Sequence, residues 1–318
     1  MARSSRASLL LSLLFVLAHG PHRAIAQSST TTFDRAVPPG ANSDKAEFRL
    51  WVPNDVRVLQ GVVVLMPGSN GDGRPEVADT IWQSFATRHQ LALIGCRFTD
   101  KPHDQGFIEA YVDVARGSGQ ALLDAVAGLA ADARRPELAA APMLLWGMSA
   151  GGEFNYEFTN WKPERVIAFV VNKGGIYYSA LTARAARNVP GILFTGEKDL
   201  ESRISTITGL FAVNRRGGAL WALAQEPGAG HIVGRSRDLA LIFFADVLAL
   251  RVAGTTPSAD GQRTLRPLVE REGFLGDIRS KTFQPAANAA APGGLTAWLP
   301  TAAVARAWQA LVTGAPFN

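Results

Sequence analysis

The 318-residue sequence predicts an α/β fold, with helices on both faces of a mostly parallel sheet and a C-terminal extension. Apolar runs of strand length alternate with longer amphipathic stretches between residues 46 and 253, a pattern typical of βαβ units. The chain is also long enough to bury the core of such a domain. Its single cysteine, Cys96, excludes a framework of disulfides within the chain.

The first 26 residues are typical of a signal peptide. Arg3 and Arg6 precede an apolar run over residues 7–18, and Ala24-Ile25-Ala26 provides small residues for cleavage. An apolar run of this length is too short to span a membrane as a helix, which needs about 20 residues. We therefore expect a secreted or periplasmic protein that begins at Gln27 and has no stable membrane insertion.

Residues 27–45 are rich in Ser, Thr and Pro and predict a flexible leader. Removing the signal peptide also removes Arg3, Arg6 and Arg23 but no acidic residue, so the formal net charge falls from +5 to +2. Such a small charge gives no indication of a nucleic-acid partner.

The core is predicted over residues 46–253. Strands are expected where apolar residues run without interruption, at 46–52, 60–66, 91–97, 142–147, 166–172, 190–196 and 218–224. Helices are expected where apolar residues recur at helical spacing, at 75–88, 106–132, 151–160, 200–213 and 232–252. Ligands of such sheets bind beyond the carboxyl ends of the strands, so functional residues are expected in the loops that follow the strands.

Ser149 lies in the motif Gly147-Met148-Ser149-Ala150-Gly151, between an apolar run and a helical stretch. In that setting a Gly-x-Ser-x-Gly motif makes a sharp strand-to-helix turn that exposes the serine hydroxyl. The flanking glycines leave room for the turn. The alternative is an ordinary glycine-rich turn, because the five-residue pattern also arises by chance. The strand before it and the helix after it favour a nucleophile.

A serine nucleophile needs a base, and three histidines remain after signal-peptide cleavage. His89 ends an amphipathic helix and His103 lies in a polar loop, so we expect both on the surface. His231 follows a flexible loop after an apolar run and precedes a long amphipathic helix. This position makes His231 the predicted base.

An acidic residue that orients the histidine is expected between the serine and the histidine in the chain. Asp199 comes just after the apolar run 189–195, and its short side chain has little freedom to lose. Asp199 is therefore the predicted acid. Other carboxylates remain as alternatives. These are Glu197, the nearest rival, and the weaker candidates Glu201 and Asp104.

Acyl transfer also requires backbone N–H groups that stabilise an oxyanion. Ala150, the residue after the serine, is expected to provide the first. The second is expected from the glycine-rich loop after the apolar run 61–66, with Ser69 as the donor and Asn70 as the alternative. A plain surface turn is the competing interpretation of this loop.

No zinc motif or Walker loop occurs in the sequence. The segment Asn70-Gly71-Asp72-Gly73 lacks the further oxygen ligands of an EF-hand. We therefore expect neither a metal nor an organic cofactor.

The order Ser149, Asp199, His231, with the Pro67-Gly68-Ser69 turn, resembles the α/β-hydrolase superfamily. Within it the chain is similar to secreted bacterial esterases related to polyhydroxybutyrate depolymerases, feruloyl esterases and polyester hydrolases, over roughly residues 46–252. The usual His-Gly before the oxyanion residue is replaced by Pro67-Gly68, as in some polyester hydrolases. The resemblance implies hydrolysis of a small-molecule or polymeric ester without a cofactor.

Two other functions are compatible with these residues. A peptidase or a lipase would use the same triad, although no extended apolar lid, which would favour a lipase, is visible beyond the C-terminal segment. A secreted binding protein would keep the hydrolase fold without the activity.

Residues 254–318 do not continue the α/β alternation and are expected to pack on the core. Residues 298–301 predict the start of a helix that runs to about Val312, with one apolar stripe. The alternative is that this segment roofs the substrate cleft, with Phe274, Leu275 and Trp298 facing the ligand.

Overall fold

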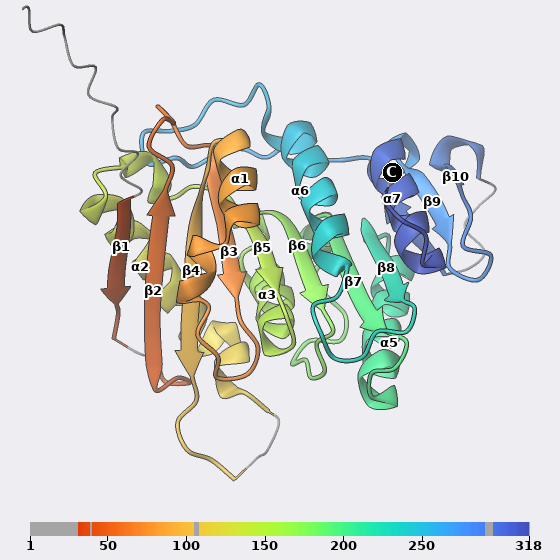
Figure 1. The fold of residues 1–318 in the computed structure, drawn as a ribbon, viewed down its shortest axis with the longest axis horizontal. Coiled ribbons are helices and arrows are strands. Elements are labelled where there is room, and N and C mark those ends of the chain that lie inside the picture. The colour runs from red at the N-terminus through yellow and green to blue at the C-terminus, as the bar shows by residue number, and fades with distance from the viewer. Residues whose placement is uncertain (1–30, 39, 105–107, 290–294, 318) are drawn as a thin grey trace, which may run out of the picture.

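The computed structural model describes residues 31–38, 40–104, 108–289 and 295–317. The expected signal peptide and Gln27 lie outside the described residues. The described chain forms one eight-stranded sheet, in the order β1-β2-β4-β3-β5-β6-β7-β8, and a separate three-stranded sheet (Figure 1). No helix within these described ranges combines the length and the apolar character needed to cross a membrane.

The large sheet consists of β1 (Thr31–Ala36), β2 (Lys45–Val52), β3 (Gly61–Met66), β4 (Leu91–Thr99), β5 (Met143–Gly147), β6 (Val166–Asn172), β7 (Gly191–Gly196) and β8 (Trp221–Glu226). Strands β3 to β8 pair in parallel, whereas β2 pairs antiparallel with both β1 and β4. The predicted α/β fold with a mostly parallel sheet is therefore confirmed.

The central strands are buried on both faces, which explains their unbroken apolar sequences. In β3, for example, Val62 and Val64 belong to the core on one face of the sheet, whereas Val63 and Leu65 belong to the core on the other. Cys96 lies buried in β4 as a free thiol.

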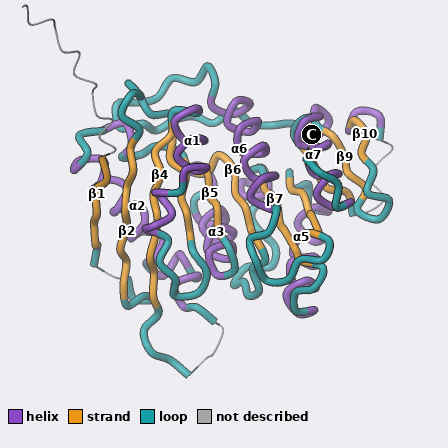
Figure 2. The backbone as a smooth tube through the Cα atoms, in the orientation of Figure 1, coloured by secondary structure: helices purple, strands orange, loops and turns teal. Residues whose placement is uncertain are grey.

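Two layers of helices sandwich the sheet. The core on one face includes side chains of α2 (Ser118–Asp132), α3 (Ala150–Trp161) and α5 (Glu201–Arg216). The core on the other face includes side chains of α1 (Thr80–Arg88), α6 (Ser236–Val252) and α7 (Ala302–Thr313). A short helix, α4 (Arg184–Arg187), precedes β7. The loops after the parallel strands gather along the lower edge of the sheet in Figure 2.

Two local predictions were wrong. The expected leader contains β1, which pairs with β2; Phe33 packs against the core and Asp34 binds Arg49 on the neighbouring strand at 2.7 Å. The helix expected over 106–132 begins only at Ser118, because Gly117 adopts a φ of 139° that no α-helix accommodates.

The C-terminal extension packs on the edge of the large sheet. Its strands β9 (Phe274–Asp277), β10 (Phe283–Pro285) and β11 (Thr296–Leu299) form the small sheet, and β11 and α7 lie against β8. Thr301 caps α7 by accepting a hydrogen bond from the N–H of Val304. The indole of Trp308 donates to the carbonyl of Leu223 at 2.8 Å, so the extension satisfies a backbone group of the edge strand.

Candidate active site

The turn that carries Ser149 joins β5 to α3. Ser149 has φ 54° and ψ −126°, a strained conformation for a residue with a side chain. A Cβ atom at Gly147 would collide with the carbonyl of Gly151, and one at Gly151 would collide with the carbonyl of Met66. These glycines allow β5, α3 and the end of β3 to approach closely enough to form the turn.

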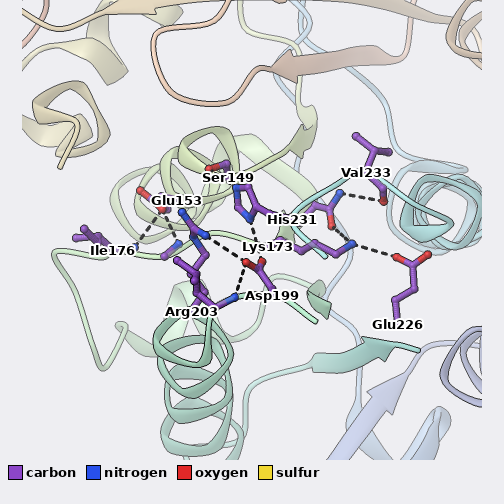
Figure 3. Close-up of polar contacts among 12 residues, drawn as sticks. Ser149, Glu153, Lys173, Ile176, Asp199, Arg203, Glu226, His231 and Val233 are labelled. Atoms are coloured by element: carbon purple, nitrogen blue, oxygen red, sulfur yellow. Dashed lines mark hydrogen bonds and ion pairs between the residues drawn. The ribbon is translucent and has the colours of Figure 1, made fainter. Parts of the chain in front are cut away.

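Three predicted residues meet beyond the carboxyl ends of the strands (Figure 3). His231 Nε2 lies 3.0 Å from Ser149 Oγ, and His231 Nδ1 lies 2.9 Å from Asp199 Oδ2. Ser149 follows β5, Asp199 follows β7, and His231 lies in the loop between β8 and α6. This is the hydrogen-bond chain through which a histidine can take a proton from a serine while a carboxylate orients the imidazole.

Asp199 is well placed to remain ionised. Burial acts to raise the pKa of its carboxyl group, but hydrogen bonds from His231 and from the N–H of Leu200 outweigh it, and the pKa lies below the ordinary value. Arg203, one turn along α5, also binds the carboxylate, with Nη1 3.2 Å from Oδ1. A fixed negative charge beside His231 favours the imidazolium that forms when the histidine accepts a proton.

Glu197, the nearest rival for the acid, faces elsewhere. Its Oε2 accepts a hydrogen bond from the N–H of Gly228 at 2.6 Å. The Glu197 carboxylate therefore binds the backbone of the loop that carries His231, whereas the imidazole itself is bound by Asp199.

The two predicted oxyanion donors lie next to the serine. Ala150 is the first residue of α3, so its N–H has no partner within the helix. Gly68, which precedes Ser69, is adjacent to Ser149, since a Cβ on Gly68 would lie 3.6 Å from Ser149 Cβ. Neither the N–H of Ser69 nor that of Ala150 donates a hydrogen bond to any residue in the described ranges. Both groups remain available to an oxyanion, while the N–H of Asn70 is used by Tyr111.

A cavity of about 740 Å³ opens beside Ser149. Ser69 and Ser149 lie in its wall, and most of the other lining side chains are polar or charged. These polar and charged residues are Asn70, Asp100, His103, Glu109, Glu153, Ser202, Arg203 and Thr206. The cavity is large enough for a small organic substrate.

Glu153 brings an unusual carboxyl group into this cavity. It lies one helical turn after Ser149 and is buried, with Oε1 accepting from the N–H groups of Gly175 and Ile176 at 2.5 and 3.1 Å. Burial raises the pKa of Glu153 to about 7, although these two hydrogen bonds partly offset the rise. The side chain therefore changes charge near neutral pH.

The serine hydroxyl is paired with His231, and the other two histidines have other partners. His89 caps the end of α1 beside Phe85, and burial lowers its pKa. His103 is exposed, as expected, and it also borders the cavity, with Nε2 3.0 Å from Asp100 Oδ2. Asp100 is held in turn by the N–H groups of Ala110 and Tyr111, which fixes this carboxylate at the cavity.

Sequence reasoning missed the charged residues around the triad. Glu153 and Arg203 lie four residues after Ser149 and Asp199, so helical spacing could have placed each beside its partner. A third residue, Lys173, follows a buried strand and pairs with Glu226. No pattern in the sequence indicates that pair, because its members are far apart in the chain.

The fold is similar to that of several solved hydrolases. LpqC, described as a poly(3-hydroxybutyrate) depolymerase from Bordetella parapertussis, matches with a TM-score of 0.50 and 18% identity over 69% of this chain and 90% of its own. A ferulic acid esterase matches with a TM-score of 0.48 and 10% identity, over 65% and 93% of the two chains. Poly(aspartic acid) hydrolase-1 from Sphingomonas sp. KT-1 matches with 0.48 and 13%, over 66% and 97%. No protein-family model matches the chain, and no curated protein matches its sequence.

The chain has the α/β-hydrolase fold. The mostly parallel sheet and the strand–turn–helix around Ser149 define it, and the similarity to LpqC agrees with this assignment. At this level of sequence identity the similarity concerns the fold alone, so the function must be argued from the site.

Proposed function

We propose that the protein is a serine hydrolase that cleaves carboxylic esters through an acyl-enzyme. The observation that carries the proposal is the hydrogen-bond chain from Ser149 Oγ through His231 to Asp199, at 3.0 and 2.9 Å. A serine held in a strained turn and bonded to a histidine is an activated nucleophile.

The reaction follows from the positions of these groups. Ser149 Oγ attacks the ester carbonyl while His231 Nε2 takes the hydroxyl proton, and the N–H groups of Ser69 and Ala150 stabilise the oxyanion. The imidazolium then gives its proton to the leaving alcohol. A water molecule, activated by the same histidine, hydrolyses the acyl-enzyme and restores Ser149. Asp199 keeps its charge throughout and stabilises the imidazolium.

The cavity wall combines apolar and charged groups. Glu109 is buried at the wall, and Glu153 and Arg203 also line the cavity. The apolar side chains of Ile108, Ile176 and Leu200 lie in the same wall. Such a lining can pack against the apolar part of an ester while a charged group fixes its orientation. A peptidase and a lipase with the same triad remain the alternatives, and substrate assays separate them.

We also propose that the enzyme acts outside the cytoplasm, as a secreted or periplasmic protein. The support is the charged, apolar and small-residue pattern of residues 1–26. Size comparison of the precursor and the exported protein would test it, with cleavage expected before Gln27.

The activity test compares wild-type protein with Ser149→Ala on p-nitrophenyl acetate, p-nitrophenyl palmitate and a p-nitroanilide. Wild type should hydrolyse the acetate, and its relative rates on the three substrates separate an esterase from a lipase and a peptidase. Ser149→Ala should lower kcat by about 10⁵-fold or more, the scale of loss when a catalytic serine is removed. Ser205→Ala, the same change at an exposed serine of α5, should be unaffected.

Preference for the anilide would reassign the protein as a peptidase, and preference for the palmitate would reassign it as a lipase. A folded wild-type protein that is inert on all three substrates would favour a binding protein instead.

A further inference from the structure

A buried ion pair lies behind the candidate active site and takes no part in the proposed chemistry. The Lys173 side chain is fully buried, with 0% exposure, and its Nζ lies 3.0 Å from Oε2 of Glu226. Lys173 directly follows β6, and Glu226 is the last residue of β8. Figure 3 places the pair on the side of the triad away from Glu153.

The lysine end of the pair is connected to the serine. Nζ of Lys173 also lies 3.3 Å from Oδ1 of Asn172, and the backbone carbonyl of Asn172 accepts the N–H of Ser149 at 2.8 Å. The side-chain amide of Asn172 donates to the carbonyl of Val233 at 3.4 Å. The residues next to Lys173 thus contact both the serine turn and the histidine loop.

The glutamate end closes the loop that carries His231. Oε1 of Glu226 accepts a hydrogen bond from the N–H of Arg235 at 2.7 Å. The carboxylate at the end of β8 therefore binds the last residue before α6, which joins the two ends of the loop. Gly234 lies directly on this carboxylate with φ 58°, and any Cβ there would collide with the Glu226 oxygens. The carbonyl of Glu226 also accepts the N–H of Glu197, in the loop that contains Asp199.

We propose that the Lys173–Glu226 pair positions His231 relative to Ser149 and Asp199. The pair and the residues next to it connect the three loops that carry the triad, and its two charges hold each other in a site that is almost closed to solvent. Both residues are positioning residues, since they touch neither the nucleophile nor the substrate cavity. The inference rests on the proposed hydrolase function.

Stability alone does not account for this pair. Taking both charges out of water costs so much that a buried ion pair is often replaced by apolar residues without loss of stability. We infer that the pair instead fixes the positions of the reacting groups. A misplacement of such groups by about 1 Å can lower a rate by about 100-fold.

The test uses Lys173→Met, Glu226→Gln and the double variant in the full-length protein. Each single variant should lower kcat by about 100-fold while KM changes by less than about threefold, because substrate groups are untouched and the histidine is displaced. The rate of labelling by a fluorophosphonate should fall in parallel. The double variant should be no slower than the slower single variant, because either change alone already breaks the ion pair.

Glu270→Gln is the matched control. Glu270 pairs with the buried Arg215 between the C-terminal extension and α5, away from the triad. Its loss should lower Tm and leave kcat unchanged, which separates positioning from general stability.

A folded Lys173→Met protein with wild-type kcat would overturn the inference, and so would a rise in KM alone. If Lys173→Met does not fold, the Glu226→Gln variant provides the test. The glutamine keeps the size of the side chain and an oxygen that accepts from the N–H of Arg235. A wild-type kcat in this variant would overturn the inference. Wild-type protein that neither hydrolyses esters nor reacts with fluorophosphonate would overturn the proposed function as well.

Discussion

Ser149 holds a backbone conformation that costs free energy, on the order of 1–3 kcal/mol for a residue of this kind. The rest of the fold supplies that energy, through the pairing of β5 with β3 and β6 and through the hydrogen bond from Ser149 N–H to Asn172. The hydroxyl is therefore presented to His231 before any substrate arrives. Such preorganisation lowers the cost of reaching the transition state.

The identity of the acid is tested by Asp199→Asn against Glu197→Gln. Asp199→Asn should lower kcat by about 10⁴-fold, because the imidazolium loses its charged partner and the histidine can adopt the wrong tautomer. Glu197→Gln is the matched change at a residue whose carboxylate accepts from the backbone N–H of Gly228, so its effect should be far smaller. Steady-state kinetics of both variants decides the matter, and the reverse ranking would move the acid to Glu197.

The raised pKa of Glu153 makes stability depend on pH. The unfolded chain releases this proton near the ordinary value of 4.5, whereas the folded protein keeps it until about 7. Between these values the folded state binds more protons, so stability falls as the pH rises through this window. The effect is on the order of 3 kcal/mol, since one pKa unit corresponds to about 1.4 kcal/mol.

Glu153→Gln should remove this dependence, because the neutral amide keeps the carbonyl oxygen that accepts from Gly175 and Ile176. Urea unfolding at about pH 5 and about pH 8 measures it, and the variant should gain stability over wild type only at the higher pH. Glu201→Gln, at an exposed glutamate of α5, is the control. Equal gains at both pH values would show that Glu153 does not titrate in this window.

The hydrogen-bonded cluster of Ser149, His231 and Asp199 was predictable because each residue follows a strand and their order in the chain matches a known pattern. Glu153 and Arg203 were not identified, since a charged residue in a helix is usually solvated and only the cavity gives these two a role. Lys173 and Glu226 required the folded structure, because their pairing depends on two loops that meet in space.

At the scale of elements, the central strands and α3, α5 and α6 were predicted within a few residues, since burial makes their apolar pattern strong. The two wrong predictions concern an edge strand and the start of a helix. The edge strand β1 has a polar sequence, because only one of its faces is covered. The start of α2 depends on Gly117, whose positive φ a hydrophobic pattern does not reveal.

The C-terminal extension packs against the core of the protein. Trp298 is buried in β11 and its indole donates to the carbonyl of Glu270 at 3.1 Å. None of the described residues of 254–318 lines the cavity beside Ser149. The expectation of a packing segment therefore has structural support, whereas a roof over the cleft has none.

Trp298→Ala should destabilise the protein by about 3–5 kcal/mol, the usual cost of truncating a buried aromatic residue. At temperatures where the variant stays folded, its KM for bulky esters should match that of wild type. Thermal unfolding and steady-state kinetics measure the two effects. A variant that melts like wild type but loses only bulky substrates would place Trp298 at the substrate site.

On the scale of the whole molecule, the parallel sheet explains how distant residues become one site. Strands β3, β5, β7 and β8 end at the same edge of the sheet (Figure 1). The loops that follow these strands carry Ser69, Ser149, Asp199 and His231. Any α/β sheet with this topology brings such loops together. The sequence predicts this edge, but the cavity wall depends on loops and helix starts whose mutual placement only the folded chain defines.

The most direct test of the central claim is covalent labelling of the folded wild-type protein with a fluorophosphonate, followed by peptide mapping. Only an activated serine reacts, because the reagent requires a hydroxyl whose proton is taken by a base. The label should be found on Ser149, with no label on Ser149→Ala and strongly slowed labelling of His231→Ala. A folded wild-type protein that stays unlabelled, or that carries the label on another serine, would contradict the account.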